Sequence, residues 1–512
     1  MRSVPEVYLS FFLAAISTAA WAQTDPALAQ SSAQLLTCES TGVDKVHCAA
    51  DTSQGVVLLK SIGAAECLLG RTWGYDDKGV WVSYQCSGVF ALANTATAPS
   101  QPAPAAPVPQ EPTPRVDEWG VFDPGKGFLV GRTDFGELGV SAYALLRFIN
   151  QMPGEQTYTD HLGNPRVTDG RRDIYPHRVM VFFKGWLGRP QLIYNIIIWT
   201  VNATDQDALF ATVGYQFTKR FAIYGGLNGF PGSRSLQGSH PFWLGNDRVM
   251  ADEYFRPYFA SGVWFQGELT PGLWYNAMVG NNNSALGVKA TQLDRTFAGG
   301  GSMWWMPTTN EFGPKGAYGD WEQHERVATR FGFSTTQSRE QRFTNADGSS
   351  GNTTVRLADG VNVFDTGAMA PGVTIEHARF RVLSIDAGVK YRGFFLQTEI
   401  YHRTIDNLEA NGPLPVASVL DRGFYVQGAF YPIPKRIELY GVMSQIYGDK
   451  DAGFGDSSEY GGGLNYYPMN TRNHRLNVQV LDVNRSPVAS TFGYYTGGQT
   501  GTTVAAAFSV FF

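Results

Sequence analysis

Sixteen runs in which apolar and polar residues alternate occupy most of the chain. In the run 380–392, Leu383 and Ile385 fall on one face of an extended strand, and Asp386 and Lys390 fall on the other. Other runs near the end of the chain divide in the same way. Strands of this kind form a sheet that has one face in an apolar medium and carries charge on the other.

The joins between these runs alternate almost strictly between short and long, and the long joins are rich in Gly, Asn and Ser. The runs are 136–150, 178–187, 191–201, 208–218, 220–229, 257–269, 273–281, 296–306, 326–336, 378–391, 394–406, 422–431, 436–447, 458–467, 474–483 and 502–512. The short joins include 188–190, 219–220, 270–272, 392–393, 432–434 and 468–473, and the long joins include 151–177, 230–256, 282–295, 338–372, 407–421 and 449–456. One join, 307–325, is long where a short one is due. Alternation of this kind is typical of an outer-membrane β-barrel, with short turns on one side and long loops on the other.

The composition agrees with a barrel and not with a bundle of membrane helices. Charged residues make up 17% of the chain, against about 25% in an average soluble domain. The longest apolar run near mid-chain, residues 192–201, is about half the ~20 residues that a spanning helix needs, and Asn195 interrupts it. Closure lets a sheet cross lipid because it pairs every backbone N–H and C=O. We therefore expect an all-β protein whose main part is a transmembrane antiparallel β-barrel of 16 strands, with fourteen or eighteen as alternatives.

The last strand, residues 501–512, places Phe508, Val510 and Phe512 on one apolar face. We expect this strand to close the barrel by pairing with the first one, residues 136–150. Aromatic residues elsewhere in the strands are expected either in the girdles at the two membrane interfaces or packed inside. These residues are Trp264, Trp274, Trp304, Trp305, Tyr391 and Tyr440.

The local amino-acid composition predicts which segments precede the barrel. Residues 1–22 carry a basic residue, an apolar run and then the small residues Ala20 and Ala22, which predicts a signal peptide and an exported mature chain. Residues 93–115 are rich in Ala, Pro, Thr and Gln, which predicts an extended spacer between two domains. The barrel domain is then expected to occupy residues 116–512.

The block between these segments, residues 34–92, contains all four cysteines of the chain: Cys38, Cys48, Cys67 and Cys86. In a small exported segment, four cysteines predict two disulfides, for which three pairings are possible. A zinc site is the alternative, but there is no Cys-x-x-Cys pair and an oxidising compartment disfavours free thiolates. We expect a small, β-rich, disulfide-bonded domain in the periplasm.

The end of this block reads TWGYD and then GVWVSYQC, and residues 77–79 are the predicted turn of a hairpin between these stretches. Over residues 37–90 the block resembles a small secreted bacterial domain of unknown function, and the resemblance implies no activity. In a domain of this size the aromatic residues are expected to form the core, with a ligand platform as the alternative.

Five segments of the barrel region carry a second resemblance: FPGSRSLQGSHPFWLGNDRVMADEYFRPYF at 230–259, GLWYNAMVGNNNSALG, KYRGFFLQTEIYHR, GLNYYP and the terminal FSVFF. Over residues 116–512 the chain resembles the phosphate-selective porin O and P family and its short-chain amide porin relatives. The resemblance implies a homotrimeric diffusion channel of sixteen strands, without cofactor or metal, whose third outside loop folds into the lumen. It also implies that Phe508, Val510 and Phe512 form the signal that the barrel assembly machinery recognises.

Residues 230–256 are the third loop on the long-loop side, and they carry charges of both signs. The candidate constriction and solute-binding residues are Arg234, His240, Arg248, Asp252, Glu253 and Arg256, with Asp247 beside them. Charged groups that line a lumen select ions by sign. The alternative is that Asp252 and Glu253 pair with Arg248 and Arg256 and hold the loop against the wall.

The expected function is passive diffusion of small polar or anionic solutes through a porin in the lipid of a bacterial outer membrane. The net charge of −5 and the lack of a basic cluster in the loop favour a weakly selective pore over one specific for phosphate, and they give no sign of nucleic-acid binding. One alternative is a structural or adhesion protein whose N-terminal domain binds the cell wall or an unknown periplasmic partner. A remote alternative is a barrel hydrolase. Ser239-His240 is the only adjacent Ser/His pair, but adjacent residues in a loop do not make a triad, because the base must turn onto the hydroxyl and be oriented by a carboxylate.

Overall fold

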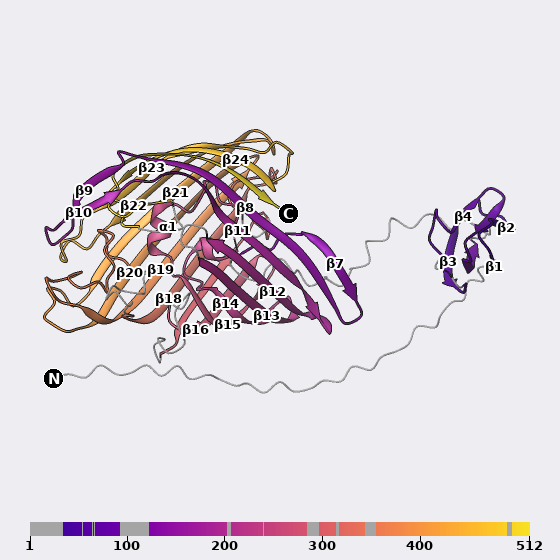
Figure 1. Ribbon diagram of the computed structural model, residues 1–512, viewed down its shortest axis with the longest axis horizontal. Helices are drawn as coiled ribbons and strands as arrows, with labels where there is room; N and C mark the ends of the chain where they lie inside the picture. Colours follow the sequence, from indigo (N-terminus) through magenta and orange to yellow (C-terminus); the bar gives the residue numbers. More distant parts are fainter. Residues whose placement is uncertain are drawn as a thin grey trace. The chain divides into compact units, whose positions relative to one another are not determined.

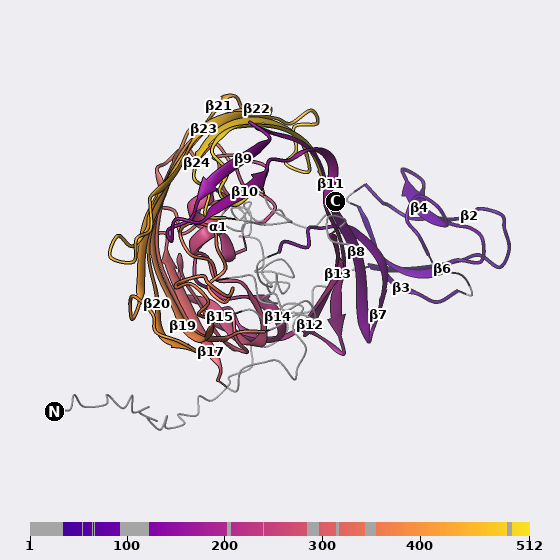
Figure 2. The same cartoon turned by 60° about the vertical axis from the view of Figure 1, so that its left-hand side comes forward.

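Antiparallel strands that pair with their neighbours in chain order form a closed ring in the computed structural model of this protein (Figures 1 and 2). The structure describes residues 34–53, 55–63, 65, 67–92, 122–201, 206–238, 240–283, 296–313, 317–343, 355–488 and 494–512. The signal peptide predicted at 1–22 and the spacer predicted at 93–115 lie outside these residues. The chain divides into two compact units, Met1–Pro109 and Gln110–Phe512.

In the second unit, the described residues contain the sixteen strands of a closed barrel, and β25 pairs with β8 to close it. The strands are β8 (Gly136–Met152), β11 (Arg172–Leu187), β12 (Arg189–Val201), β13 (Gln206–Thr218), β14 (Phe221–Gly229), β15 (Phe259–Thr270), β16 (Leu273–Gly280), β17 (Ala298–Trp305), β18 (Ala328–Gln341), β19 (Ile375–Tyr391), β20 (Phe394–Ala410), β21 (Val419–Ile433), β22 (Ile437–Tyr447), β23 (Ser457–Tyr466), β24 (His474–Asn484) and β25 (Gly501–Phe511). The predicted fold class is confirmed, and each predicted run overlaps one of these strands.

Three short strands in this unit were not predicted. β7 (Phe128–Thr133) pairs with the beginning of β8, next to the stretch of β8 that pairs with β25. β9 (Glu155–Thr159) and β10 (Pro165–Asp169) form a hairpin in the first long loop. We call the end of the barrel that carries the long loops the loop side and the opposite end the turn side; β8 begins and β25 ends on the turn side.

The two faces of each strand meet different surroundings, as the alternation predicts. On β19, the outward side chains of Leu383 and Ile385 are 37% and 54% exposed, whereas the inward Asp386 and Lys390 are 2% and 0% exposed. A closed ring with an apolar exterior is the arrangement in which a β-sheet crosses a lipid bilayer. No helix among the described residues is both long enough and apolar enough to span a membrane.

The aromatic residues of the strands divide between the two faces. Trp305 and Tyr391 are exposed on the exterior, next to the turn side. The prediction of an interface girdle is wrong for four residues, which pack in the interior: Trp264, Trp274, Trp304 and Tyr440. Strand parity explains the difference, because Trp264 and the exposed Val263 are neighbours on β15 and therefore face opposite ways.

The first unit contains two small antiparallel sheets. β1 (Gln34–Glu39), β6 (Ser87–Leu92) and β3 (Val56–Ser61) form one sheet, in the order β1-β6-β3. β2 (Val46–Ala49), β5 (Gly79–Val82) and β4 (Trp73–Asp76) form the other, and the β4–β5 hairpin turns where the sequence predicts. Trp73, Val80, Val82 and Phe90 are buried in the shared core. The expectation that the aromatic residues form the core is confirmed for Trp73 and Phe90, but it is wrong for Tyr75 and Tyr84, which are 45% and 60% exposed.

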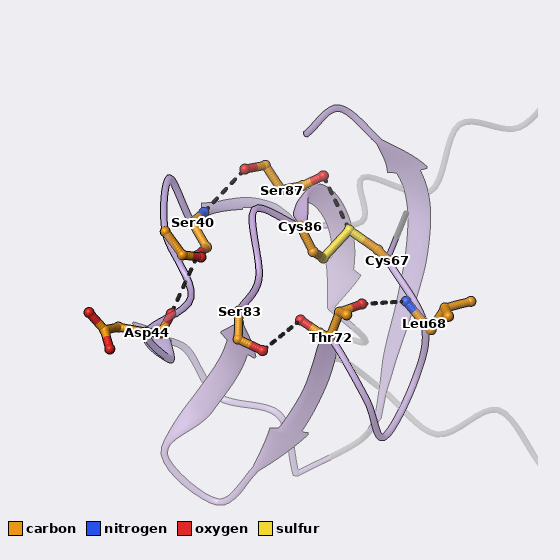
Figure 3. The surroundings of a disulfide bond; sticks show 9 residues. Ser40, Asp44, Cys67, Leu68, Thr72, Ser83, Cys86 and Ser87 are labelled. Atoms are coloured by element: carbon orange, nitrogen blue, oxygen red, sulfur yellow. Dashed lines mark hydrogen bonds between the residues drawn. A yellow bond between two sulfur atoms is a disulfide. The ribbon is translucent and has the colours of Figure 1, made fainter. Parts of the chain in front are cut away.

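Both predicted disulfides are present in this unit, and the structure selects one of the three pairings: Cys38 with Cys48 and Cys67 with Cys86. Figure 3 shows the second bond, which ties a connecting loop to the beginning of β6. Beside it, the Leu68 amide donates to the Thr72 hydroxyl over 2.7 Å. Cross-links compensate for the small core that a domain of this size buries.

Candidate functional site

Residues 230–258, the third loop, run through the interior of the barrel between β14 and β15. The loop contains the short 3-10 helix η2 (Arg234–Leu236) and the helix α1 (Met250–Phe255), which Figures 1 and 2 show inside the ring of strands. All residues of both elements are buried, including their charged ones. The loop therefore occupies space inside the ring of strands.

A wall carboxylate anchors the beginning of α1. Glu459 of β23 accepts a hydrogen bond from the Met250 amide over 2.7 Å and another from the Ser444 hydroxyl over 2.9 Å. The Tyr495 hydroxyl, from the last long loop, lies 2.9 Å from the other Glu459 oxygen and 3.1 Å from the Arg248 carbonyl oxygen. A negative side chain is favourable at a helix N-terminus because the first amides lack partners within the helix.

The charges of the third loop pair with one another. Arg256 donates two hydrogen bonds to the Glu253 carboxylate, over 2.9 and 2.7 Å. Arg248 lies 3.6 Å from Asp252 and 3.9 Å from Glu253, and it donates to the Ser235 hydroxyl over 2.9 Å. These are the pairs that the alternative expects, but they join residues of the loop to one another and do not themselves attach it to the wall.

A second ion pair joins the loop to the strand wall on another side. Arg178 of β11 donates from Nη2 to both carboxylate oxygens of Asp247, each over 3.0 Å, and His177 lies 3.5 Å from the same carboxylate. The guanidinium groups of Arg178 and Arg248 also lie near the face of Trp243, 5.1 and 4.3 Å from its ring centroid. The loop is thus held from β11 and from β23.

Arg234 and His240 occupy different environments. The Arg234 side chain donates to Gln397 Oε1 over 3.0 Å, and its amide donates to Glu399 over 3.0 Å. His240 is buried among the rings of Phe122, Tyr143 and Trp243, with centroids 5.0 to 5.3 Å away. Burial holds the pKa of His240 well below its ordinary value, so the ring is neutral and packs as an aromatic side chain. Ser239 lies outside the described residues.

The sequence did not single out the wall residues that receive the loop. Besides Glu399 and Glu459, Arg403 of β20 and Asp421 of β21 form a fully buried ion pair, with Nε 3.2 Å from the carboxylate. The Arg403 guanidinium lies 3.9 Å from the centroid of the Tyr254 ring, and the Tyr254 hydroxyl donates to Asp421 over 3.0 Å. The sequence did show charged residues on the polar, inward face of these strands. Strand parity does not indicate which of these residues contact the third loop.

A buried apolar cluster in the interior includes residues of both ends of the barrel, such as Phe312 and Tyr318 next to the turn side. Val249 and Met250 of the third loop belong to it, together with Leu357 and Phe364 of the loop between β18 and β19 and Val488 of the last loop. Loops that are distant in sequence therefore share one core inside the ring.

One group of side chains has the composition of a metal site. Asp320, Glu322 and His324 place possible ligand atoms within 4.8 Å of one another. Both ring nitrogens of His324 already bond carboxylates, Nδ1 to Asp320 and Nε2 to Glu311 over 2.8 Å. These hydrogen bonds raise the pKa of His324 to about 9. Because both ring nitrogens already bond carboxylates, the geometry fits an ion-pair clamp.

This clamp predicts a pH dependence. The stabilisation is fully present below pH 6.5, the ordinary pKa of histidine, and is lost as the pH rises through about 9, because the neutral ring bonds only one carboxylate as a donor. We expect limited proteolysis to cut residues 306–327 faster at pH 10 than at pH 7. A His324→Gln variant should be cut at the same rate at pH 7 and at pH 10. If cleavage of the variant increased between these pH values as much as cleavage of the wild type, the role of His324 would be contradicted.

Comparison with known proteins gives a family match for the first unit and a likeness of architecture for the second. Residues 35–103 match a family described as a protein of unknown function, DUF3011. No curated protein matches the chain.

Solved structures similar to the chain are outer-membrane proteins. OmpF of Salmonella typhi, in complex with daunomycin, is 13% identical with a TM-score of 0.45, and the match covers 75% of this chain and 100% of that one. An anion-selective porin from Comamonas acidovorans is 11% identical with a TM-score of 0.42, covering 73% and 100%. The trimer form of OmpT, an outer-membrane protein of Vibrio cholerae, is 10% identical with a TM-score of 0.44, covering 74% and 100%. The assignment of a barrel rests on the strand pairing of this chain itself.

Proposed function

We propose that the chain is a bacterial outer-membrane porin through which small polar or anionic solutes diffuse passively. The observation that carries the proposal is a closed ring of sixteen strands with an apolar exterior, a polar interior and a folded loop inside it. Rings of sixteen strands are too wide for wall side chains alone to fill, so they leave room for a channel. The third loop would set the narrowest width of that channel.

The proposed selectivity is weak and favours anions. The six candidate residues of the loop are largely occupied with one another and with the wall, which leaves wall arginines to act on the solute. Arg475 of β24, which is 6% exposed, donates to the carbonyl oxygens of Trp243 and Gly245, and the described residues show no ion pair for it. An arginine without a carboxylate partner attracts anions. Membership of the phosphate-selective porin O and P family is part of this proposal and rests on the motifs quoted above.

The turn side is proposed to face the periplasm, because short turns lie on that side in outer-membrane barrels. Both ends of the barrel lie there, which agrees with a disulfide-bonded domain (34–92) and a spacer (93–115) in the periplasm after removal of residues 1–22. A homotrimer, recognition of the terminal strand by the assembly machinery and a periplasmic partner for the N-terminal domain complete the proposal.

Liposome swelling tests the proposal. Full-length protein refolded into vesicles should admit arabinose, short amides and phosphate at rates that fall with solute size. Protein left unfolded by omitting the refolding step is the control. Vesicles that hold folded barrel but stay impermeable to all three solutes would overturn the proposal.

A second candidate function is a membrane anchor that carries the N-terminal domain. The apolar cluster that joins the third loop to two other loops inside the ring favours this candidate, because such packing obstructs a channel. An anchor would give no swelling, while the full-length protein would co-sediment with purified cell-wall sacculi and a variant lacking residues 34–92 would not.

A further inference from the structure

The long join on the turn side, residues 306–327, is described at 306–313 and 317–327, and part of these residues enters the barrel. It connects β17 to β18, and other connections on this side are only a few residues long, such as 271–272 between β15 and β16 and 392–393 between β19 and β20. Phe312 and Tyr318 of this segment are 1% and 3% exposed. We call residues 306–327 the turn-side segment.

Wall residues fix the turn-side segment in the interior. The Lys390 ammonium, on the inward face of β19, donates to the carbonyl oxygens of Phe312 and Ala317 over 2.6 and 2.7 Å. The Gly393 amide donates to Asp320 over 2.7 Å, which ties the segment to the turn between β19 and β20. The segment is therefore attached to the inner wall and not only to its own two strands.

The turn-side segment also meets the third loop. The Tyr318 amide donates to the Phe242 carbonyl oxygen over 3.1 Å, and the Arg234 guanidinium lies 4.5 Å from the centroid of the Tyr318 ring. The Tyr318 hydroxyl also reaches the wall at β21, where it lies 3.4 Å from the hydroxyl of Tyr425. On the turn side, Arg472 of the β23–β24 turn donates to the Tyr318 carbonyl oxygen over 2.8 Å. Tyr318 thus lies where both inserted segments and the wall converge.

We propose that the turn-side segment is the second half of the constriction, and that Tyr318 is a specificity-determining residue of the pore. This inference rests on the proposed porin function. A cation over an aromatic face is attracted to the ring, which covers one side of its charge. Tyr318 accordingly has two roles: it closes the gap between the loop and the β21 wall, and it covers the charge of Arg234.

The test uses full-length variants in planar bilayers. In one variant, residues 308–326 are replaced by a two-residue turn, and the single-channel conductance should rise roughly twofold or more, because conductance follows the open area. Tyr318→Ala should raise the conductance roughly 1.5-fold and shift the reversal potential in a KCl gradient toward anions, since Arg234 becomes exposed. Tyr318→Phe keeps the ring and should preserve the selectivity.

Glu325→Gln is the matched control, because Glu325 is an exposed residue of the same segment and should leave both readouts unchanged. Folding of each variant is checked by heat-modifiable mobility in gels. Wild-type conductance and selectivity in both the folded 308–326 replacement and Tyr318→Ala would overturn the inference while leaving the porin function intact. A folded wild-type protein that never conducts would overturn the porin function instead.

Discussion

Replacing residues 233–256 by a short Gly-Ser linker is expected to raise the single-channel conductance roughly threefold or more. The excised stretch contains η2 and α1, whose side chains are buried inside the ring. Its charges are three arginines and three acidic residues, so the excision removes no net charge. The change in conductance therefore measures the open area and not a change in the charge that the loop itself carries.

The control for this excision is another loop on the loop side, whose Leu414 and Val416 touch the interior cluster only at its edge and are partly buried. Residues 411–418, between β20 and β21, are exposed or half-exposed. Shortening them should leave the conductance as it is in the wild type. If both excisions gave wild-type conductance in folded barrels, the third loop would not limit the passage of ions.

Arg403→Ala is expected to lower the free energy of unfolding of the barrel by about 3–5 kcal/mol. The substitution leaves the Asp421 carboxylate buried without its partner, and it also removes the guanidinium from the face of Tyr254. Urea titration of the barrel in lipid vesicles, followed by tryptophan fluorescence, measures the change.

Two further variants separate the loss of stability caused by a buried charge without a partner from the loss caused by missing packing contacts. Arg403→Met with Asp421→Asn removes both charges and should recover part of the stability. Arg379→Ala breaks an ion pair with Asp406 that is partly exposed, with 33% of the arginine side chain accessible, and should cost within about 1 kcal/mol. Equal losses for Arg403→Ala and Arg379→Ala would contradict the importance of burial at the loop–wall contact.

The strands of the barrel were predictable because the rule behind them is local. Every second side chain faces lipid, so an apolar and a polar face can be read from neighbouring residues such as Leu383 and Ser384. The same parity would have placed Trp264 inside, had it been applied to β15. β7 was missed because its residues Phe128, Leu129 and Val130 are all apolar and do not alternate with polar residues. All three side chains are exposed, and β7 pairs with the part of β8 that lies beyond the end of β25.

The site was less predictable because it is made by contacts between distant segments. The family resemblance and the position of the loop identified residues 230–256, and the ion pairs of Asp252 and Glu253 were foreseen as the alternative to solute contact. No local pattern indicates that Glu459 reaches the amide of Met250 or that the turn-side segment meets Arg234. The anomalous length of join 307–325 was visible, but its position inside the ring depends on Lys390 and Gly393, far along the chain. Disulfide pairing likewise depends on the order of strands in the two small sheets.

Single-channel recording of the full-length wild-type protein tests the central claim most directly. Folded protein added to a planar bilayer in KCl should produce discrete conductance steps of uniform size, and a salt gradient should give a reversal potential displaced modestly toward anions. Heat-modifiable mobility of the same sample shows that the barrel is folded. A folded sample that enters the bilayer and yields no discrete steps would contradict the assignment of this barrel as a diffusion channel.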